Sequence, residues 1–200
     1  MRFDIILLVM EEDYMIDIYV ACPTLENDDF HLSIVSQANC SDLLKVYSDP
    51  LAIPFFNVDN CNGDDFHYTT IERMKDAIDF WIYSYNYRWF VRWAIIDKNT
   101  DEAIGTVECF HRESADDFNG VGLIRVDLRH DYENENCVSS IFKLIIHPFY
   151  RYFNCSKIIT KGFDDSSGRT EALLKLGFIK SDIPLIGNNL EYYNYWAIQK

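Results

Sequence analysis

The sequence lacks the patterns that would indicate a metal centre, a disulfide scaffold or a membrane anchor. Its 200 residues include six cysteines, with no C-x-x-C pair and no zinc-like spacing to histidine. We therefore expect no metal site, and unpaired thiols predict a reducing, cytoplasmic location. The apolar run Ile5–Met10 is too short to span a membrane and lacks the layout of a signal peptide.

Basic residues are also scarce. Lys and Arg number 18 against 32 Asp and Glu, which gives a formal net charge of −14. Because phosphate contacts need clustered Lys and Arg, we expect neither nucleic acid nor a membrane surface as a partner. The acidic excess fits a cationic small-molecule or peptide amine as substrate, although plain solubility is the simpler explanation. Nothing in the composition predicts the oligomeric state.

The residues that are present suit one globular domain with a sizeable core. Hydrophobic residues make up 48% of the chain and aromatic residues 16%, which excludes a disordered chain. We expect residues 1–22 to form an N-terminal hairpin extension, with strands at 5–10 and 15–21. Residues 23–200 would then form the main domain.

Hydrophobic periodicity predicts alternating strands and helices in this domain. Thr69 and Glu72 form a capping-box pattern that opens a helix, and Pro148 is expected to end or kink another. The alternation, with an antiparallel start, predicts an α/β (α+β) class with a mixed sheet. Strands are expected at 30–35, 90–97, 102–112, 122–129, 157–161, 178–180 and 191–198, and helices at 42–47, 69–85, 138–149 and 166–175.

Four segments in order carry a resemblance to a known family. They are Pro23–Glu26, Asp42–Pro50, Trp93–Asp97 with Ala103–Val107, and Leu173–Phe178. From about residue 22 to 200 the chain resembles the GNAT superfamily of N-acetyltransferases, nearest to the ribosomal-protein N-terminal acetylating (RimJ/RimL-like) type. The resemblance implies a mainly antiparallel sheet flanked by helices. It also implies transfer of acetyl from acetyl-CoA to a primary amine, on a protein N-terminus or a small molecule.

The strand–helix–strand order at 122–129 and 157–161 requires a parallel crossover, so these strands should be parallel neighbours. The resemblance implies that they splay apart near Asp131. It further implies that the loop after the first strand holds the cofactor's pyrophosphate.

The pyrophosphate loop departs from the family pattern, which reads roughly Gln/Arg-x-x-Gly-x-Gly/Ala. Glu135 takes the place of the essential glycine, which lets the backbone approach phosphates closely. Glu133 and Glu135 add negative charge beside an anionic ligand, and Arg129, His130 or Lys161 are the candidates to compensate. The sequence therefore also fits a non-catalytic GNAT-fold protein that binds another ligand or a protein. By resemblance, the cofactor-binding positions are Leu128, Arg129, Tyr132, Asn134, Glu135, Asn136, Cys137, Val138 and Ser166.

Two carboxylates are candidates for the general base that takes the amine proton. Glu108 lies on an apolar strand, where burial raises the pKa of a carboxyl group. Asp127 is the second candidate, on the strand that in this family flanks the pantetheine arm. For each, the alternative is an ion pair: with Arg92 or Arg125 for Glu108, and with Arg125 or Arg129 for Asp127.

The last predicted helix also departs from the family pattern. Leu174 stands where many relatives have a tyrosine general acid. Ser166 stands where the N-terminal acetylating type has a cofactor-contacting asparagine, and Arg169 where it has a serine. The acid step and part of the cofactor contact therefore have no obvious residue.

Overall fold

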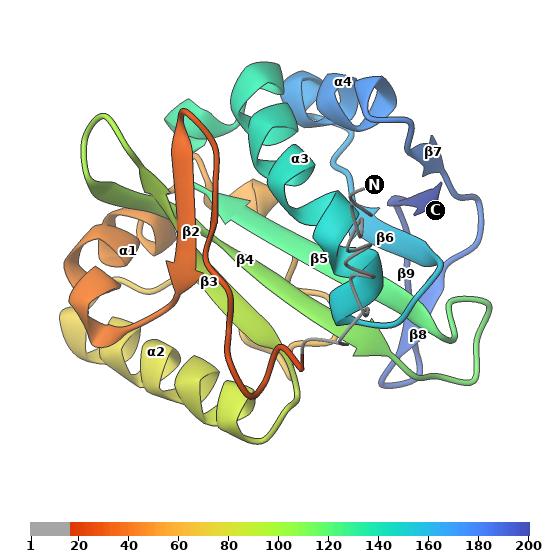
Figure 1. Ribbon diagram of the computed structural model, residues 1–200, viewed down its shortest axis with the longest axis horizontal. Helices are drawn as coiled ribbons and strands as arrows, with labels where there is room; N and C mark the ends of the chain where they lie inside the picture. The colour runs from red at the N-terminus through yellow and green to blue at the C-terminus, as the bar shows by residue number, and fades with distance from the viewer. Residues whose placement is uncertain (1–16) are drawn as a thin grey trace, which may run out of the picture.

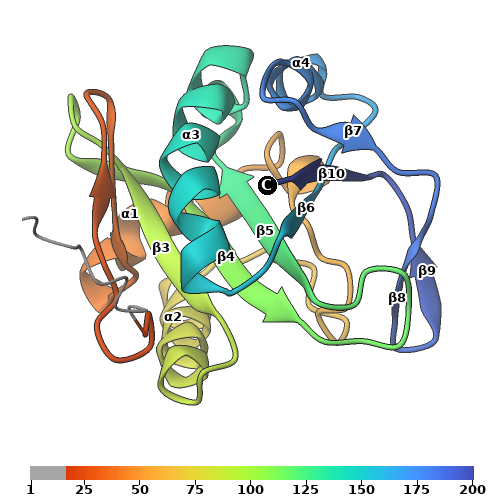
Figure 2. The same ribbon diagram turned by 45° about the vertical axis from the view of Figure 1, so that its right-hand side comes forward.

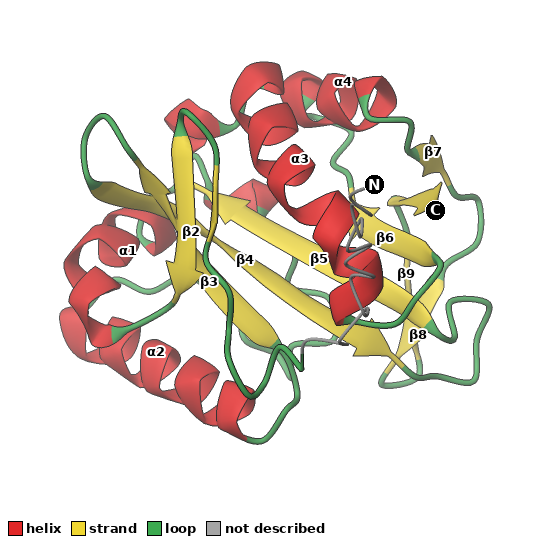
Figure 3. Cartoon of the chain, viewed as in Figure 1, coloured by secondary structure: helices red, strands yellow, loops and turns green. Residues whose placement is uncertain are grey.

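The computed structural model describes residues 17–200, and its main feature is an eight-stranded sheet. The strand order is β1-β2-β3-β4-β5-β6-β10-β7, and β8 pairs with β9 in a separate small sheet (Figures 1 and 3). Within residues 17–200, only β5 and β6 pair in parallel, which confirms the predicted mixed, mainly antiparallel sheet. The strands are β1 Leu25–Glu26, β2 Phe30–Ile34, β3 Val91–Asp97, β4 Glu102–Arg112, β5 Val121–Leu128, β6 Lys157–Lys161, β7 Ile179–Lys180, β8 Leu185–Gly187, β9 Leu190–Tyr192 and β10 Tyr195–Gln199.

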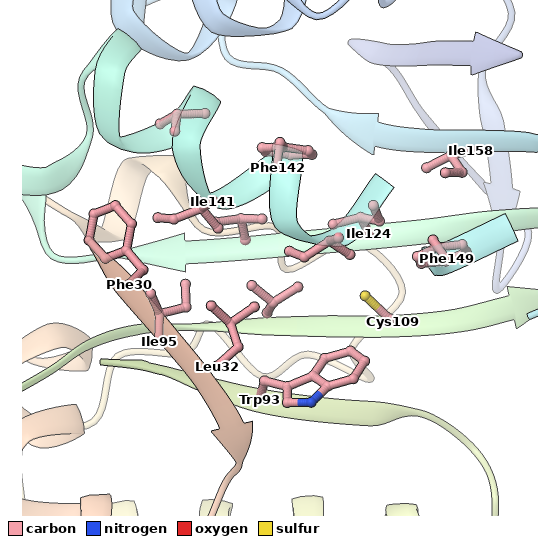
Figure 4. Packing of buried hydrophobic residues seen from close by; sticks show 14 of the residues in the cluster. Phe30, Leu32, Trp93, Ile95, Cys109, Ile124, Ile141, Phe142, Phe149 and Ile158 are labelled. Carbon is pink, nitrogen blue, oxygen red and sulfur yellow. The ribbon is translucent and has the colours of Figure 1, made fainter. Parts of the chain in front are cut away.

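Helices cover both faces of the sheet (Figure 2). The helices are α1 Cys40–Tyr47, α2 Ile71–Asn86, α3 Glu135–Tyr152 and α4 Ser167–Lys175. On one face, α3 packs Ile141, Phe142 and Phe149 against sheet residues such as Trp93 and Ile124 (Figure 4). On the other face, α1 and α2 form a second core of buried aromatic and aliphatic residues.

Strand alternation separates these two cores and places charged residues on one of them. Trp93 lies opposite Val107, and both belong to the core beneath α3. One residue along each strand, Arg92 lies opposite Glu108, and Glu108 lies opposite Arg125. Because successive side chains of a strand point to opposite faces, this charged row faces α1 and α2.

The structure corrects one predicted helix boundary and excludes one of the two alternatives stated for Pro148. Thr70, not Thr69, is the N-cap of α2, and its hydroxyl accepts from the amide of Arg73 at 3.2 Å. Pro148 does not end α3, which continues to Tyr152. A proline removes one helical hydrogen bond, but Ile145 and Phe149 on either side are buried in the core. That packing outweighs the missing bond.

The two ends of the chain also differ from prediction. Residues 1–16, with the predicted strand at 5–10, lie outside the described part. Residues 17–21 form a turn in which Val20 donates to the carbonyl of Asp17, not the predicted second strand. The division at residue 22 stays a prediction. The expected strand at 191–198 is two strands, because Asn194 between them has φ of +67°.

Candidate functional site

The parallel pair β5 and β6 separates after a short contact. Their register runs from Gly122 opposite Ile158 to Ile124 opposite Thr160, and β5 continues to Leu128 without a β6 partner. The two strands are therefore parallel neighbours as predicted. The gap opens toward the loop that joins β5 to α3.

A buried ion pair fills the gap between the separated strands. Arg169 of α4 donates from Nη1 to the carbonyl of Val126 at 2.9 Å. Its Nε and Nη2 donate to the two carboxylate oxygens of Glu133, each at 2.6 Å. The Ser166 hydroxyl, which also caps α4, donates to the same carboxylate at 3.1 Å. The side chains of Arg169 and Glu133 are only 1% and 5% exposed.

In the loop between β5 and α3, several backbone amides donate hydrogen bonds to acceptors in the same loop. His130–Tyr132 form a 3₁₀ turn, so the amides of Tyr132 and Glu133 donate to carbonyls within the loop. Asn134 is the N-cap of α3, and its side chain accepts from the amide of Cys137 at 3.1 Å. A pyrophosphate needs such amides free. In this conformation the amides of Tyr132, Glu133 and Cys137 are therefore not free to bind one.

The first turn of α4 lies directly against this loop. A Cβ on Gly168 would stand 2.8 Å from the Cα of Asn134, so only glycine permits the contact. The three cations that the sequence suggested as compensators are already engaged. Arg129 pairs with Asp131 and Glu102, His130 bonds Asp49, and Lys161 pairs with Asp59.

The remaining predicted cofactor residues lie in different environments. Leu128 and Val138 are buried in the core beneath α3. Tyr132 donates its hydroxyl to Asp97 at 2.8 Å. Glu135 reaches the surface, where it pairs with Lys175 at 2.7 Å. Asn134 and Asn136 are exposed, and Cys137 is half-buried.

On the opposite face, Glu108 forms a double ion pair. Its carboxylate accepts from Arg92 and, at 2.6 Å, from Arg125 Nη1. Trp81 of α2 covers the guanidinium of Arg92, which lies 4.3 Å from the ring centroid. Burial alone would raise the pKa of the Glu108 carboxyl group, but the two guanidinium groups outweigh it and the pKa is lowered. The expected increase in the pKa of Glu108 was therefore wrong, and the alternative ion pair forms with both arginines.

Asp127 lies on the separated part of β5, two residues beyond Arg125. Its carboxylate accepts from the hydroxyl of Tyr47 at 3.0 Å and from Arg92 Nη1 at 3.4 Å. The predicted partners Arg125 and Arg129 are engaged elsewhere. Burial raises the pKa of Asp127, against the opposing effects of Arg92 and Tyr47. Burial also raises the pKa of Tyr47, so this tyrosine stays a neutral donor.

A pocket of about 670 Å³ opens beside Glu108 and Arg125, between α2 and the loop that precedes it. Asp64 of that loop borders the pocket and pairs with Arg73 at 2.6 Å. The walls of the pocket are largely aromatic and include Phe66, Tyr68, Trp81, Phe90 and Phe110.

Asp59 belongs to the same loop as Asp64. It is buried, and it accepts from Lys161 of β6 at 2.6 Å and from the Tyr195 hydroxyl of β10 at 3.1 Å. These bonds anchor the loop to β6 and β10.

Over residues 17–200, no group of three or more His, Cys, Asp or Glu side chains is placed to hold a metal ion. In the same range, every helix is too short or too polar to cross a membrane.

Comparison with known proteins identifies the fold. No family model and no curated protein matches the sequence. Among solved structures, the acetyltransferase of the GNAT family from Bacillus anthracis aligns with a TM-score of 0.64 at 12% identity, over 88% of this chain and 98% of that chain. The GNAT fold is defined by the separated parallel strands β5 and β6, the helix α3 that joins them, and the flanking layers.

Two ribosomal-protein acetyltransferases share this architecture. RimL, the ribosomal L7/L12 α-N-protein acetyltransferase in complex with coenzyme A, aligns with a TM-score of 0.66 at 12% identity, over 88% of this chain and 98% of that one. The ribosomal-protein-S5-alanine acetyltransferase from Vibrio fischeri aligns with a TM-score of 0.62 at 14% identity, over 89% and 96%. The chain therefore has the GNAT fold of these enzymes.

Proposed function

We propose that the protein is an acyltransferase that moves an acetyl group from acetyl-CoA to a primary amine, on a peptide N-terminus or a small molecule. The observation that carries this proposal is the separation of β5 from β6 in a chain with the GNAT fold. From Arg125 to Leu128, the edge of β5 that faces β6 has no strand partner, although the other edge pairs with β4. Coenzyme A bound to RimL supports an acyl-CoA as the donor.

The pocket beside Glu108 suits the amine substrate. Guanidinium groups of Arg73, Arg92 and Arg125 already lie over five of its aromatic rings. Phe80 and Trp89 also line the pocket, and their ring faces can stabilise a cation. A net charge of −14 raises the local concentration of cations around the whole molecule. A pocket of about 670 Å³ accommodates a small molecule or the first residues of a peptide.

By its pKa, Asp127 is the better candidate for the proton acceptor, although it is buried and does not line the pocket, so the amine proton would have to reach it through an intervening group. A general base works best when its pKa lies near the working pH, and the pKa of Asp127 is raised while that of Glu108 is lowered. Asp127 also lies on the separated part of β5, where Tyr47 orients its carboxylate. In this proposal Glu108 is a positioning residue that holds Arg92 and Arg125 in place.

The test measures thiol release from acetyl-CoA with a panel of amines and N-terminal peptides. Asp127→Asn should lower kcat by about 10²–10⁴-fold, the usual contribution of a general base. The wild-type rate should rise with pH along one ionisation above the ordinary Asp range. An Asp127→Asn variant with wild-type kcat would remove Asp127 from the mechanism.

The Glu133–Arg169 pair favours a second candidate, a non-catalytic GNAT-fold protein that binds another ligand or a protein. This pair occupies the gap where relatives would admit the cofactor. A thermal-shift titration separates the candidates. Acetyl-CoA at about 100 times its Kd should stabilise a binding protein by about 2.7 kcal/mol. An unchanged Tm at millimolar acetyl-CoA would favour the second candidate.

A further inference from the structure

The Glu133–Arg169 pair has the chemistry of an occupied anion site. Arg169 presents a buried guanidinium whose Nε and Nη2 each lie 2.6 Å from a carboxylate oxygen. The Ser166 hydroxyl adds a third donor at 3.1 Å. A planar fork of this kind matches carboxylate and phosphate oxygens equally well. The anion it holds comes from the chain's own loop.

We propose that Glu133 is an internal anion that occupies a phosphate-binding site formed by Arg169, Ser166 and the first turn of α4. The Glu133 carboxylate blocks this site until a phosphate-bearing acyl donor displaces it. This inference rests on the proposed function for the identity of the donor. It assigns Arg169, on α4, as the cation that binds the donor's phosphate once the loop has moved.

The position of Arg169 supports a preformed site. Its Nη1 donates to the Val126 carbonyl, so the guanidinium is fixed to β5 independently of Glu133. Gly168 beside it has no side chain and lies against Asn134 of the loop. When the loop withdraws, the first turn of α4 therefore presents a surface that phosphate oxygens can approach closely.

Glu133 can leave only if the loop moves, because Tyr132 is bonded to Asp97 and Asn134 caps α3. Glu133 is held in the interior, whereas the next residues, Asn134 and Asn136, are exposed. Glu135 pairs with Lys175 at the surface. Exchange of the carboxylate for a phosphate ester keeps Arg169 paired, so no buried charge is left without a counter-ion.

Calorimetric titration of Glu133→Gln tests the inference, with coenzyme A and inorganic pyrophosphate as separate probes. Glutamine keeps the size of the side chain but removes the competing charge. We expect both probes to bind at least about tenfold more tightly than to wild type, a change of about 1.4 kcal/mol. Glu171→Gln is the matched control, because Glu171 is exposed on α4, the helix that carries Arg169, and has the same charge as Glu133. Equal gains in both variants, or no gain in Glu133→Gln, would overturn the inference.

Two further measurements test the inference if Glu133→Gln does not fold. Glu133→Gln combined with Arg169→Met replaces the pair by two neutral side chains and should fold, yet bind both probes more weakly than wild type. In wild type, saturating coenzyme A should increase amide hydrogen exchange at residues 133–137. Binding of coenzyme A that leaves this exchange unchanged would overturn the inference.

The outcomes separate this inference from the proposed function. Amine acetylation by wild type, with no change in coenzyme A affinity on Glu133→Gln, would retain the function and reject the internal anion. Tighter pyrophosphate binding on Glu133→Gln, with no turnover on any amine, would retain the internal anion and reject the function.

Discussion

At the scale of single residues, Glu108 stabilises the sheet through its two ion pairs. Glu108→Gln removes the counter-ion of the largely buried Arg125 and one of the two counter-ions of the buried Arg92, which keeps Asp127. Because an uncompensated buried charge is strongly destabilising, we expect a loss of about 3–5 kcal/mol in unfolding free energy at neutral pH. Denaturant unfolding measures it, with the exposed Glu171→Gln as a control that should change little. A loss no larger than the control's would contradict the role of the pair.

The lowered pKa of Glu108 also fixes how this loss depends on pH. The folded state favours the carboxylate, so its stabilisation is fully present above the ordinary Glu pKa of about 4.3. It is lost as the pH falls through the lowered folded pKa. The difference between wild type and Glu108→Gln should therefore shrink in acid. A difference that grows in acid would contradict the direction of the shift.

Asp127 should show the opposite dependence, because its folded pKa is raised. Its stabilisation is present below the ordinary Asp pKa of about 3.9 and is lost as the pH rises through the folded value. Asp127→Asn does not titrate at this position. Relative to wild type, this variant should gain unfolding free energy as the pH rises from about 4 toward neutrality. Urea unfolding across this range gives the sign directly.

At the scale of elements, the contact between α3 and α4 depends on one glycine. Gly168→Ala would usually stabilise a helix by roughly 0.5–1 kcal/mol. Here the new Cβ would stand 2.8 Å from the Cα of Asn134, so the two helix ends must separate. We expect a net loss of about 1–3 kcal/mol in unfolding free energy. Ser167→Ala, at the exposed neighbour, is the control. A stabilised Gly168→Ala would show that the ends are not in contact.

Sequence periodicity predicted the elements well where one rule decided them. The bounds of β4 and β6 follow from alternation and flanking turns, and the parallel order follows from the crossover between β5 and β6. Local rules failed where two neighbours could serve equally, as at Thr69 and Thr70. At Pro148 they offered an end or a kink, and packing on both sides of the proline excludes the end.

The candidate site was predictable only across adjacent strands. Arg92 and Glu108 are direct cross-strand neighbours, so their pairing was one of two stated alternatives. The pair of Glu133 with Arg169 joins residues 36 positions apart, and no spacing rule links a loop to a later helix. The contact of Tyr47 with Asp127 spans 80 positions and was missed for the same reason.

At the scale of the whole molecule, the acidic excess opposes folding. With 18 basic and 32 acidic residues, the compact state gathers a charge of −14. Salt screens this repulsion, since the Debye length falls from about 30 Å at 0.01 M to about 10 Å at 0.1 M. We expect the Tm to rise over this range of NaCl. Sucrose at equal osmolality is the control for non-ionic effects. A falling Tm would show that screening of the ion pairs dominates.

The insertion of β10 between β6 and β7 has a consequence for synthesis of the protein on the ribosome. β6 pairs with β5 on one side, and its other edge has no partner until Tyr195–Gln199 arrive. A nascent chain that has already formed the β5–β6 pair therefore exposes an open edge containing Ile158 and Ile159. Such edges pair readily with other chains, and Lys157 and Lys161 at its ends oppose this.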